Sequence, residues 1–190
     1  LYFEYTTFFN LMLKDGTVSA GGFHTDYGVG IRVLKGEKTG YAYSENTEMS
    51  DMLKAAEAAS AIALGADACQ AYSRVIDRKT DCYPDTESWR KHQADEFLPF
   101  IQNLEKAIFA KDSRIVKVII RLSNSVSDIM MFNSLGELTT DSRPMGSITA
   151  TAVFEQDGKT ENRSVSRSFR KGAEMITPEL LEEMADEAVK

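Results

Sequence analysis

Residues that could bind a metal ion or carry out catalysis are few in this chain. Histidine occurs twice, as His24 in the stretch GGFHTDYG and as His92 in a segment without clear periodicity. A protein zinc site takes three or four ligands that converge on one point. Asp26 is the one neighbour of His24 that suggests a pair, so we interpret His24 as a surface histidine on a strand and expect no metal site here.

The two cysteines, Cys69 and Cys82, do not form a C-x-x-C motif and have no histidine close by. A disulfide between them is one interpretation. The other is a buried thiol and a loop thiol in a reducing compartment, which the usual distribution of cysteine between compartments favours. We therefore expect the protein in the cytoplasm.

Serines alternate with larger residues in the stretch NRSVSRSF, which predicts a strand with two different faces. One face holds Ser164, Ser166 and Ser168, and the other holds Arg163, Val165, Arg167 and Phe169. The serines lack the glycine-rich elbow of a nucleophile. Two interpretations stay open: a solvated edge strand whose charges discourage pairing, or an open edge where an extended peptide adds as a strand, with the three serines as possible peptide contacts.

Glycines occur inside the strands of GVGIRVLKGEKTGYAYSEN, residues 28–46, as well as between them. They are Gly28, Gly30, Gly36 and Gly40. We expect Gly36 to supply the turn of a four-residue loop at 35–38. That register leaves one face thin at Gly40, where the helix that follows can approach closely.

The other face of this hairpin explains the remaining glycines without a ligand. We expect Tyr43 to cover Gly30 and Arg32 to lie beside Tyr41, within reach of a cation–π contact. A phosphate-binding loop that starts at Gly28 is the alternative. It lacks a correctly placed third glycine and a helix that opens onto the phosphate.

Most of the chain is expected to form strands, joined by turns at Asp15-Gly16, at 133–136 and at Asp157-Gly158. The expected strands are 1–9, 10–13, 18–25, 27–34, 39–44, 114–123, 127–132, 137–141, 147–155 and 159–170. Hairpins dominate over parallel crossovers. The fold class is therefore α+β, a largely antiparallel sheet with helices packed on one side in a two-layer sandwich.

Three helices are expected, at 50–64, at 96–110 and from Thr177 onward. Ser50 is the expected N-cap of the first and Gly65 its C-terminal stop. Pro99 fits best in the first turn of the second helix, where its missing N–H costs nothing. Thr177 and Pro178 suit the N-cap and first positions of the last helix.

Length and composition predict one domain over 1–190. Its expected parts are a β-meander with a helix (1–65), a connection (66–91) and a helix, antiparallel strands and a terminal helix (92–190). Hydrophobic residues make up 43% of the chain, and no apolar run is long enough to span a membrane. The net charge of −7 argues against a nucleic-acid surface, although five basic residues gather between 159 and 171. The chain opens directly on strand-like residues without Met, as a piece of a longer protein would.

Several of these stretches resemble the amino-terminal domain of the TldD/PmbA family, also known as modulators of DNA gyrase, and are most similar to TldD. The similar stretches are LYFEYTTFF, DYGVGIR and GEKTGYAY in the first half, and NSLG, DSRP and the strand from Ser147 in the second. The family motif positions in this chain are Gly28, Gly30, Arg32, Gly36, Gly40, Tyr41, Asp141, Arg143 and Pro144. We expect mainly structural roles for them.

Two of these motif residues, Asp141 and Arg143, fall on the same face of an expected strand. They could form an ion pair at a corner of the sheet. Pro144 is expected to end regular pairing there, because it has no N–H to donate.

The resemblance implies a two-domain bacterial or archaeal zinc metallopeptidase that acts on unfolded or flexible peptides. In that family zinc is bound by an H-E-x-x-x-H helix and a cysteine of the carboxy-terminal domain, and this chain has no such motif. We therefore expect no catalytic residue and no cofactor in this chain, with zinc in a missing carboxy-terminal domain. The resemblance also implies a homodimer or heterodimer with a family member. From the net charge and the lack of a long apolar run, we expect no direct nucleic-acid or membrane binding.

The chain would then be a non-catalytic scaffold that shapes a peptide channel. Many family members are glycine-rich where this chain has Ser164, Ser166 and Ser168. The resemblance therefore gives less support to peptide contacts by these serines than to the other roles. The alternative is a stand-alone protein-interaction module of the gyrase-modulator type, without a hydrolytic role. The reading frame beyond Lys190 distinguishes the two.

Overall fold

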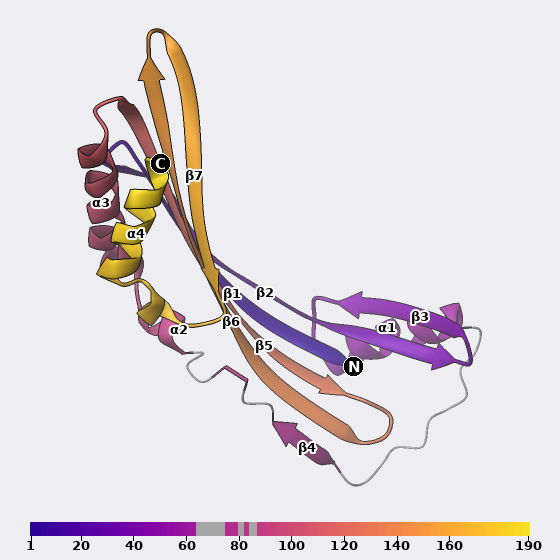
Figure 1. Ribbon diagram of the computed structural model, residues 1–190. Helices are drawn as coiled ribbons and strands as arrows, with labels where there is room; N and C mark the ends of the chain where they lie inside the picture. Colours follow the sequence, from indigo (N-terminus) through magenta and orange to yellow (C-terminus); the bar gives the residue numbers. More distant parts are fainter. Residues whose placement is uncertain (64–74, 80–81, 84–86) are drawn as a thin grey trace. The chain divides into compact units, whose positions relative to one another are not determined.

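The structure is a computed structural model that describes residues 1–63, 75–79, 82–83 and 87–190. In chain order its elements are β1 (Tyr2–Lys14), β2 (Thr17–Lys35), β3 (Lys38–Ser44), α1 (Met49–Ile62), β4 (Ile76–Lys79), α2 (Ser88–Lys91), α3 (Ala94–Lys111), β5 (Ile115–Phe132), β6 (Glu137–Gln156), β7 (Lys159–Phe169), the 3-10 helix η1 (Ala173–Met175) and α4 (Pro178–Ala188) (Figure 1). β1, β2, β5 and β6 are each one long strand where two short strands were expected.

Hydrogen bonds order the strands as β3-β2-β1-β5-β6-β4, and β7 pairs with β6. The β2–β3 and β6–β7 hairpins are antiparallel, whereas β4 runs parallel to the first residues of β6. The sheet is largely antiparallel and helices pack against it, so the expected α+β fold is confirmed.

The turns follow the sequence signals with one difference. Asp15-Gly16 and Asp157-Gly158 both have positive φ at both positions, the pattern of a two-residue hairpin turn. The expected four-residue loop at 35–38 is wrong in length. Lys35 pairs directly with Lys38, so the turn itself is Gly36-Glu37. The register beyond it, with Val33 opposite Gly40, is as expected.

Contacts divide the chain into two compact units. Unit 1 comprises Leu1–Thr6, Thr25–Cys82 and Ser127–Ser142, and unit 2 comprises Thr7–His24, Tyr83–Val126 and Arg143–Lys190. The four long strands β1, β2, β5 and β6 each contribute residues to both units.

Unit 2 contains the larger core, formed between its strands and the helices α3 and α4. Along β6 the residues of SITATAVFE alternate in burial, and Ile148, Ala150 and Ala152 are fully buried. The helices bury one face each, with Ile101, Leu104 and Ile108 from α3, and Leu181, Met184, Ala185 and Ala188 from α4. The two helices lie side by side (Figure 1).

Helix α3 begins at Ala94, two residues before the expected start, because Gln93 and Glu96 form a capping box. The Gln93 N–H donates to the Glu96 carboxylate at 3.0 Å. Pro99 therefore lies in the second turn, and its expected place in the first turn is wrong. Its missing N–H removes one hydrogen bond of the helix, while the buried face of α3 continues past it.

Helix α4 begins as expected, with Pro178 in its first turn and the Thr177 hydroxyl accepting from the Leu180 N–H at 3.3 Å. Two basic residues link α4 to its neighbours. Arg167 of β7 donates to Glu187 at 2.6 Å, and Lys111 of α3 donates to Asp186 at 2.7 Å. These bonds lower the pKa of both carboxyl groups.

Unit 1 contains a small core in which helix α1 packs on the β2–β3 hairpin. Ala55 and Ala59 are buried against Val29 and Ile31. Gly40 allows the close approach, because a Cβ at that position would lie 1.8 Å from the Ala59 carbonyl oxygen. The expected role of Gly40 is confirmed.

The other face of this hairpin differs from the expectation in one contact. A Cβ on Gly30 would lie 2.7 Å from the hydroxyl oxygen of Tyr41, so Tyr41 and not Tyr43 covers Gly30. Tyr43 is opposite Gly30 in the register but is 70% exposed. A diagonal neighbour is within reach of an aromatic side chain, and Tyr41 uses that reach.

The expected connection at 66–91 contains two elements where the structure describes it, β4 and α2. β4 is a four-residue strand, too short to show a period. In α2, Trp89 is buried and its indole N–H donates to the Lys171 carbonyl at 2.7 Å. Gly65 and Cys69 lie outside the described residues, and Cys82 is exposed.

Among the described residues, no helix has both the length and the apolar character needed to cross a membrane.

We predict that Gly40→Ala destabilises unit 1, because the new methyl group meets helix backbone that cannot rotate away. The free energy of unfolding should fall by about 1–3 kcal/mol, the usual cost of overpacking. Urea denaturation measures the loss, and faster amide exchange in β3 and α1 locates it. The control is Gly30→Ala, where the exposed Tyr41 ring can swing away. Equal losses in the two variants would contradict the role of Gly40.

We predict that acid weakens the attachment of α4. The folded-state pKa values of Asp186 and Glu187 are lowered by their bonds to Lys111 and Arg167. Their contribution to stability is therefore present above the unfolded pKa values, about 4, and is lost as the pH falls through the lower folded values. Thermal melts from pH 7 to pH 2.5 test this. The double variant Asp186→Asn, Glu187→Gln should show a shallower decline than the unchanged chain, and identical profiles would count against it.

Candidate functional site

The three serines of β7 are arranged as the sequence indicates, on one face, and each bonds to a hydroxyl of β6. Ser164 pairs with Thr151 at 2.8 Å, Ser166 with Thr149 at 2.9 Å and Ser168 with Ser147 at 3.0 Å. We call these six residues the hydroxyl ladder. Their hydroxyl groups satisfy one another across the two strands, so they are not poised as nucleophiles.

The β6 members of the ladder were not recognised from the sequence. Their signal was present, because Ser147, Thr149 and Thr151 alternate with the buried residues of β6. An antiparallel partner with serines at every second position would place hydroxyl groups opposite one another, as the register shows.

The other face of β7 is occupied by its contacts with core and helix. Val165 is buried, and Arg167 donates to Glu183 at 2.7 Å as well as to Glu187. Arg167 is thus committed to α4 and does not contribute free positive charge to the basic stretch at 159–171.

The edge of β7 that faces away from β6 pairs with no strand among the described residues. An edge strand presents a row of main-chain N–H and C=O groups to solvent. An extended peptide can pair with such groups regardless of its sequence. This edge is the candidate site, and the hydroxyl ladder lies on the adjoining face of β6 and β7.

The histidines do not form a metal centre in the part of the chain that the structure describes. The His24 ring stacks on Phe8 with 4.6 Å between ring centroids, and His92 Nδ1 lies 2.8 Å from a carboxylate oxygen of Glu96. Nowhere in the described ranges do three His, Cys, Asp or Glu side chains gather as metal ligands would. The described residues therefore do not fit a zinc ion.

The family motif glycines of the hairpin lie where a side chain would not fit or where the turn needs a positive φ. A Cβ on Gly28 would lie 2.8 Å from the Ser44 carbonyl oxygen, and Gly36 has a φ of +58° in the turn. Arg32 is exposed, and the expected cation–π contact with Tyr41 is not found between these two described residues. The Tyr41 ring lies over Gly30 instead.

The second group of motif residues lies on β6. Asp141 accepts a hydrogen bond from the Ser142 N–H at 3.0 Å. Pro144 is fully buried, and β6 continues through it. The pairing of β6 with β4 reaches only to Thr140, and its pairing with β7 begins at Gly146, so the expectation that Pro144 ends regular pairing stays a prediction. The ion pair between Asp141 and Arg143 stays a prediction.

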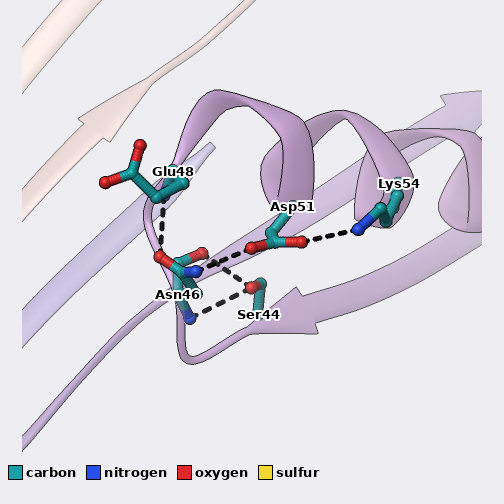
Figure 2. A network of polar contacts seen from close by, with 5 residues as sticks. All are labelled: Ser44, Asn46, Glu48, Asp51 and Lys54. Carbon is teal, nitrogen blue, oxygen red and sulfur yellow. Dashed lines mark hydrogen bonds and ion pairs between the residues drawn. The ribbon is translucent and has the colours of Figure 1, made fainter.

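A polar network at the start of α1 was not expected from the sequence (Figure 2). Asn46 accepts from the Glu48 N–H at 3.0 Å and donates to Asp51 at 2.7 Å, and Lys54 donates to Asp51 at 2.8 Å. The expected N-cap at Ser50 is wrong, since Glu48 occupies that position without a side-chain cap. The Asn46 side chain orders this turn instead, because asparagine readily bonds to the backbone two residues on.

Comparison with known proteins identifies two family matches. Residues 1–63 match the first domain of the PmbA/TldA metallopeptidases, and residues 87–190 match their central domain. A metalloprotease TldD homolog of Haemophilus influenzae is 30% identical over 178 residues, which covers 90% of this chain and 36% of the relative. The chain therefore spans about a third of the length of that curated relative.

Solved structures show the same fold at lower identity. A candidate modulator of a DNA gyrase from Thermotoga maritima superposes with a TM-score of 0.71 at 22% identity, covering 99% of this chain and 43% of that one. TldE from Thermococcus kodakarensis gives a TM-score of 0.65 at 13% identity, covering 99% and 43%. With more than half of its residues matched by the central domain alone, the chain belongs to the TldD/PmbA (PmbA/TldA) metallopeptidase family.

Proposed function

We propose that this chain is the non-catalytic scaffold and peptide-channel part of a TldD-like zinc metallopeptidase that acts on unfolded or flexible peptides. The observation that carries the proposal is the match of residues 1–63 and 87–190 to the first and central domains of a metallopeptidase family. The metalloprotease relative extends well beyond the part that this chain covers.

Hydrolysis is assigned to residues outside this chain. Its described histidines are engaged with Phe8 and Glu96 and do not converge. The zinc expected for the family therefore belongs, in this proposal, to a carboxy-terminal domain, and the present chain takes part by holding the substrate and the catalytic part in place.

The open edge of β7 is the proposed wall of the channel. Flexible peptides have unpaired main-chain groups, and pairing with a strand edge satisfies them without regard to side chains. Folded substrates keep these groups in their own secondary structure. A strand edge thus favours unfolded over folded chains.

We propose a homodimer or a heterodimer with a family member, in the cytoplasm, without direct contact to nucleic acid or membrane. Support comes from the net charge of −7 and from the use of Arg167 in bonds to α4. Clustered, free Lys and Arg would be needed to bind nucleic acid.

We predict that the 190-residue chain alone neither cleaves casein nor retains stoichiometric zinc after dialysis. The reason is the lack of converging ligands in its described part. Gel analysis of casein and metal analysis of the dialysed chain are the measurements, and a longer protein that includes an H-E-x-x-x-H segment is the positive control. Cleavage by this chain that a chelator abolishes would refute the proposal. A reading frame that stops after Lys190 would favour the stand-alone interaction module instead.

We predict that the triple variant Ser164→Ala, Ser166→Ala, Ser168→Ala binds a fluorescent unfolded peptide with a Kd within about twofold of the unchanged chain. Pairing at the edge uses main-chain groups, whereas these hydroxyl groups bond to β6. Fluorescence anisotropy gives the Kd, and amide exchange shows whether β7 gains protection when peptide is added. Loss of binding in this variant, with its fold intact, would mean that the serine hydroxyl groups contact the peptide directly.

A further inference from the structure

A cavity of about 540 Å³ lies in unit 2 at the turn end of the β6–β7 hairpin. It is lined by Arg114 just before β5, by the β6–β7 turn and the strand residues next to it, and by the two residues that follow α4. The volume is in the range of sites that bind small ligands or single side chains. We call it the hairpin pocket.

The hairpin pocket carries an excess of positive charge. Arg114, Lys159, Arg163 and Lys190 line it together with two acidic residues, Asp157 and Glu161. The chain as a whole has a net charge of −7, so this local excess runs against its overall charge. A negatively charged group of modest size is the complementary ligand.

One of the cations is held in place before any ligand arrives. The Arg114 guanidinium donates to the Asp112 carboxylate at 2.6 Å and to the Gln156 side chain at 3.2 Å, and it lies 6.0 Å from the centroid of the Phe154 ring. Arg114 holds the pKa of Asp112 down at about 2. The charges of Arg114 and Asp112 cancel, which leaves Lys159, Arg163 and Lys190 as the remaining cations of the pocket, against Asp157 and Glu161. Of these three cations, Lys159 and Arg163 belong to β7.

The position of the pocket along β7 suggests which anion it takes. Lys159 and Arg163 are the first and fifth residues of β7. A strand that pairs antiparallel to β7, as β6 does on its other side, brings its carboxyl end to the beginning of β7. A peptide on the open edge would therefore end beside the hairpin pocket.

We propose that the hairpin pocket binds the terminal carboxylate of an extended peptide that pairs antiparallel with the open edge of β7. This inference rests on the proposed function, because it presupposes a peptide on that edge. It adds a substrate class, peptides with a free carboxyl end, and an orientation. Lys159 and Arg163 are the residues that recognise the charged end, through charge-assisted hydrogen bonds.

The test compares two fluorescent unfolded peptides of ten residues with the same sequence, one ending in a free carboxylate and one in an amide. Anisotropy titrations of the 190-residue chain at low salt should give a Kd about tenfold lower for the free carboxylate. The ratio should shrink as salt is added, because Lys159 and Arg163 are exposed.

Two variants locate the effect. In the double variant Lys159→Gln, Arg163→Gln the ratio of the two Kd values should fall to about one. The matched control is Lys106→Gln, an exposed lysine of α3 outside the pocket, which should keep the full ratio. Circular dichroism and thermal melts check that both variants are folded.

The outcomes separate this inference from the proposal beneath it. If both peptides bind equally well to the unchanged chain, the hairpin pocket does not recognise a carboxylate, while peptide binding by the chain stands. If the tenfold ratio persists in the double variant, recognition lies elsewhere and the pocket assignment is wrong. If neither peptide binds, the peptide-channel function fails and this inference fails with it.

Discussion

The arrangement of unit 2 depends on the burial of one face of β6 and β7 under α3 and α4. Ile148, Ala150 and Ala152 of β6 and Val165 of β7 are all within the core. The alanines keep this side of β6 thin, so the helices can lie close to the sheet. Because strand side chains alternate between faces, the same burial directs the hydroxyl groups of both strands to the opposite side.

In unit 1 the helix also lies close to the sheet, and the residues at the contact are still smaller. Gly40 has no side chain where α1 crosses β3, and the backbone of the helix at Ala59 approaches it there. The core there is small, and Asn46 and Asp51 add polar bonds at the start of the helix. Backbone proximity, rather than a large apolar area, defines how α1 sits on its hairpin.

Much of the fold could be predicted because local rules and packing agree. Asp-Gly pairs marked two hairpin turns, the alternation in β6 marked its buried face, and Thr177-Pro178 marked the start of α4. The β2–β3 register followed from the turn and the hydrophobic pattern. In each case residues close in the sequence carried the information.

The wrong expectations concern features that depend on residues distant in the sequence or diagonally placed in the sheet. β4 is recognisable only through its pairing with β6. Tyr41 covers Gly30 from a diagonal position that a simple pairing scheme overlooks. The preference of proline for the start of a helix predicts Pro99 in the first turn of α3. The capping box at Gln93 sets an earlier start, which puts Pro99 in the second turn. The hydroxyl ladder combines residues of two strands, so it becomes visible only once the register of the β6–β7 hairpin is known.

The candidate site was predictable only in part. The serine face of β7 was visible in the sequence, but its partners on β6 and the hairpin pocket were not. The pocket is lined by Arg114 just before β5, by the β6–β7 hairpin and by Val189 and Lys190. These residues are far apart in the sequence, so no local pattern predicts that they lie together.

The hydroxyl ladder also bears on how this sheet can change over evolutionary time. Each hydrogen bond of the ladder joins one residue of β6 to one of β7, such as Thr151 to Ser164. Replacing one of the two leaves the other hydroxyl group without its partner. Substitutions at these positions should therefore be accepted in matched pairs. A change at a serine of β7 should be accompanied by a change at the opposite residue of β6.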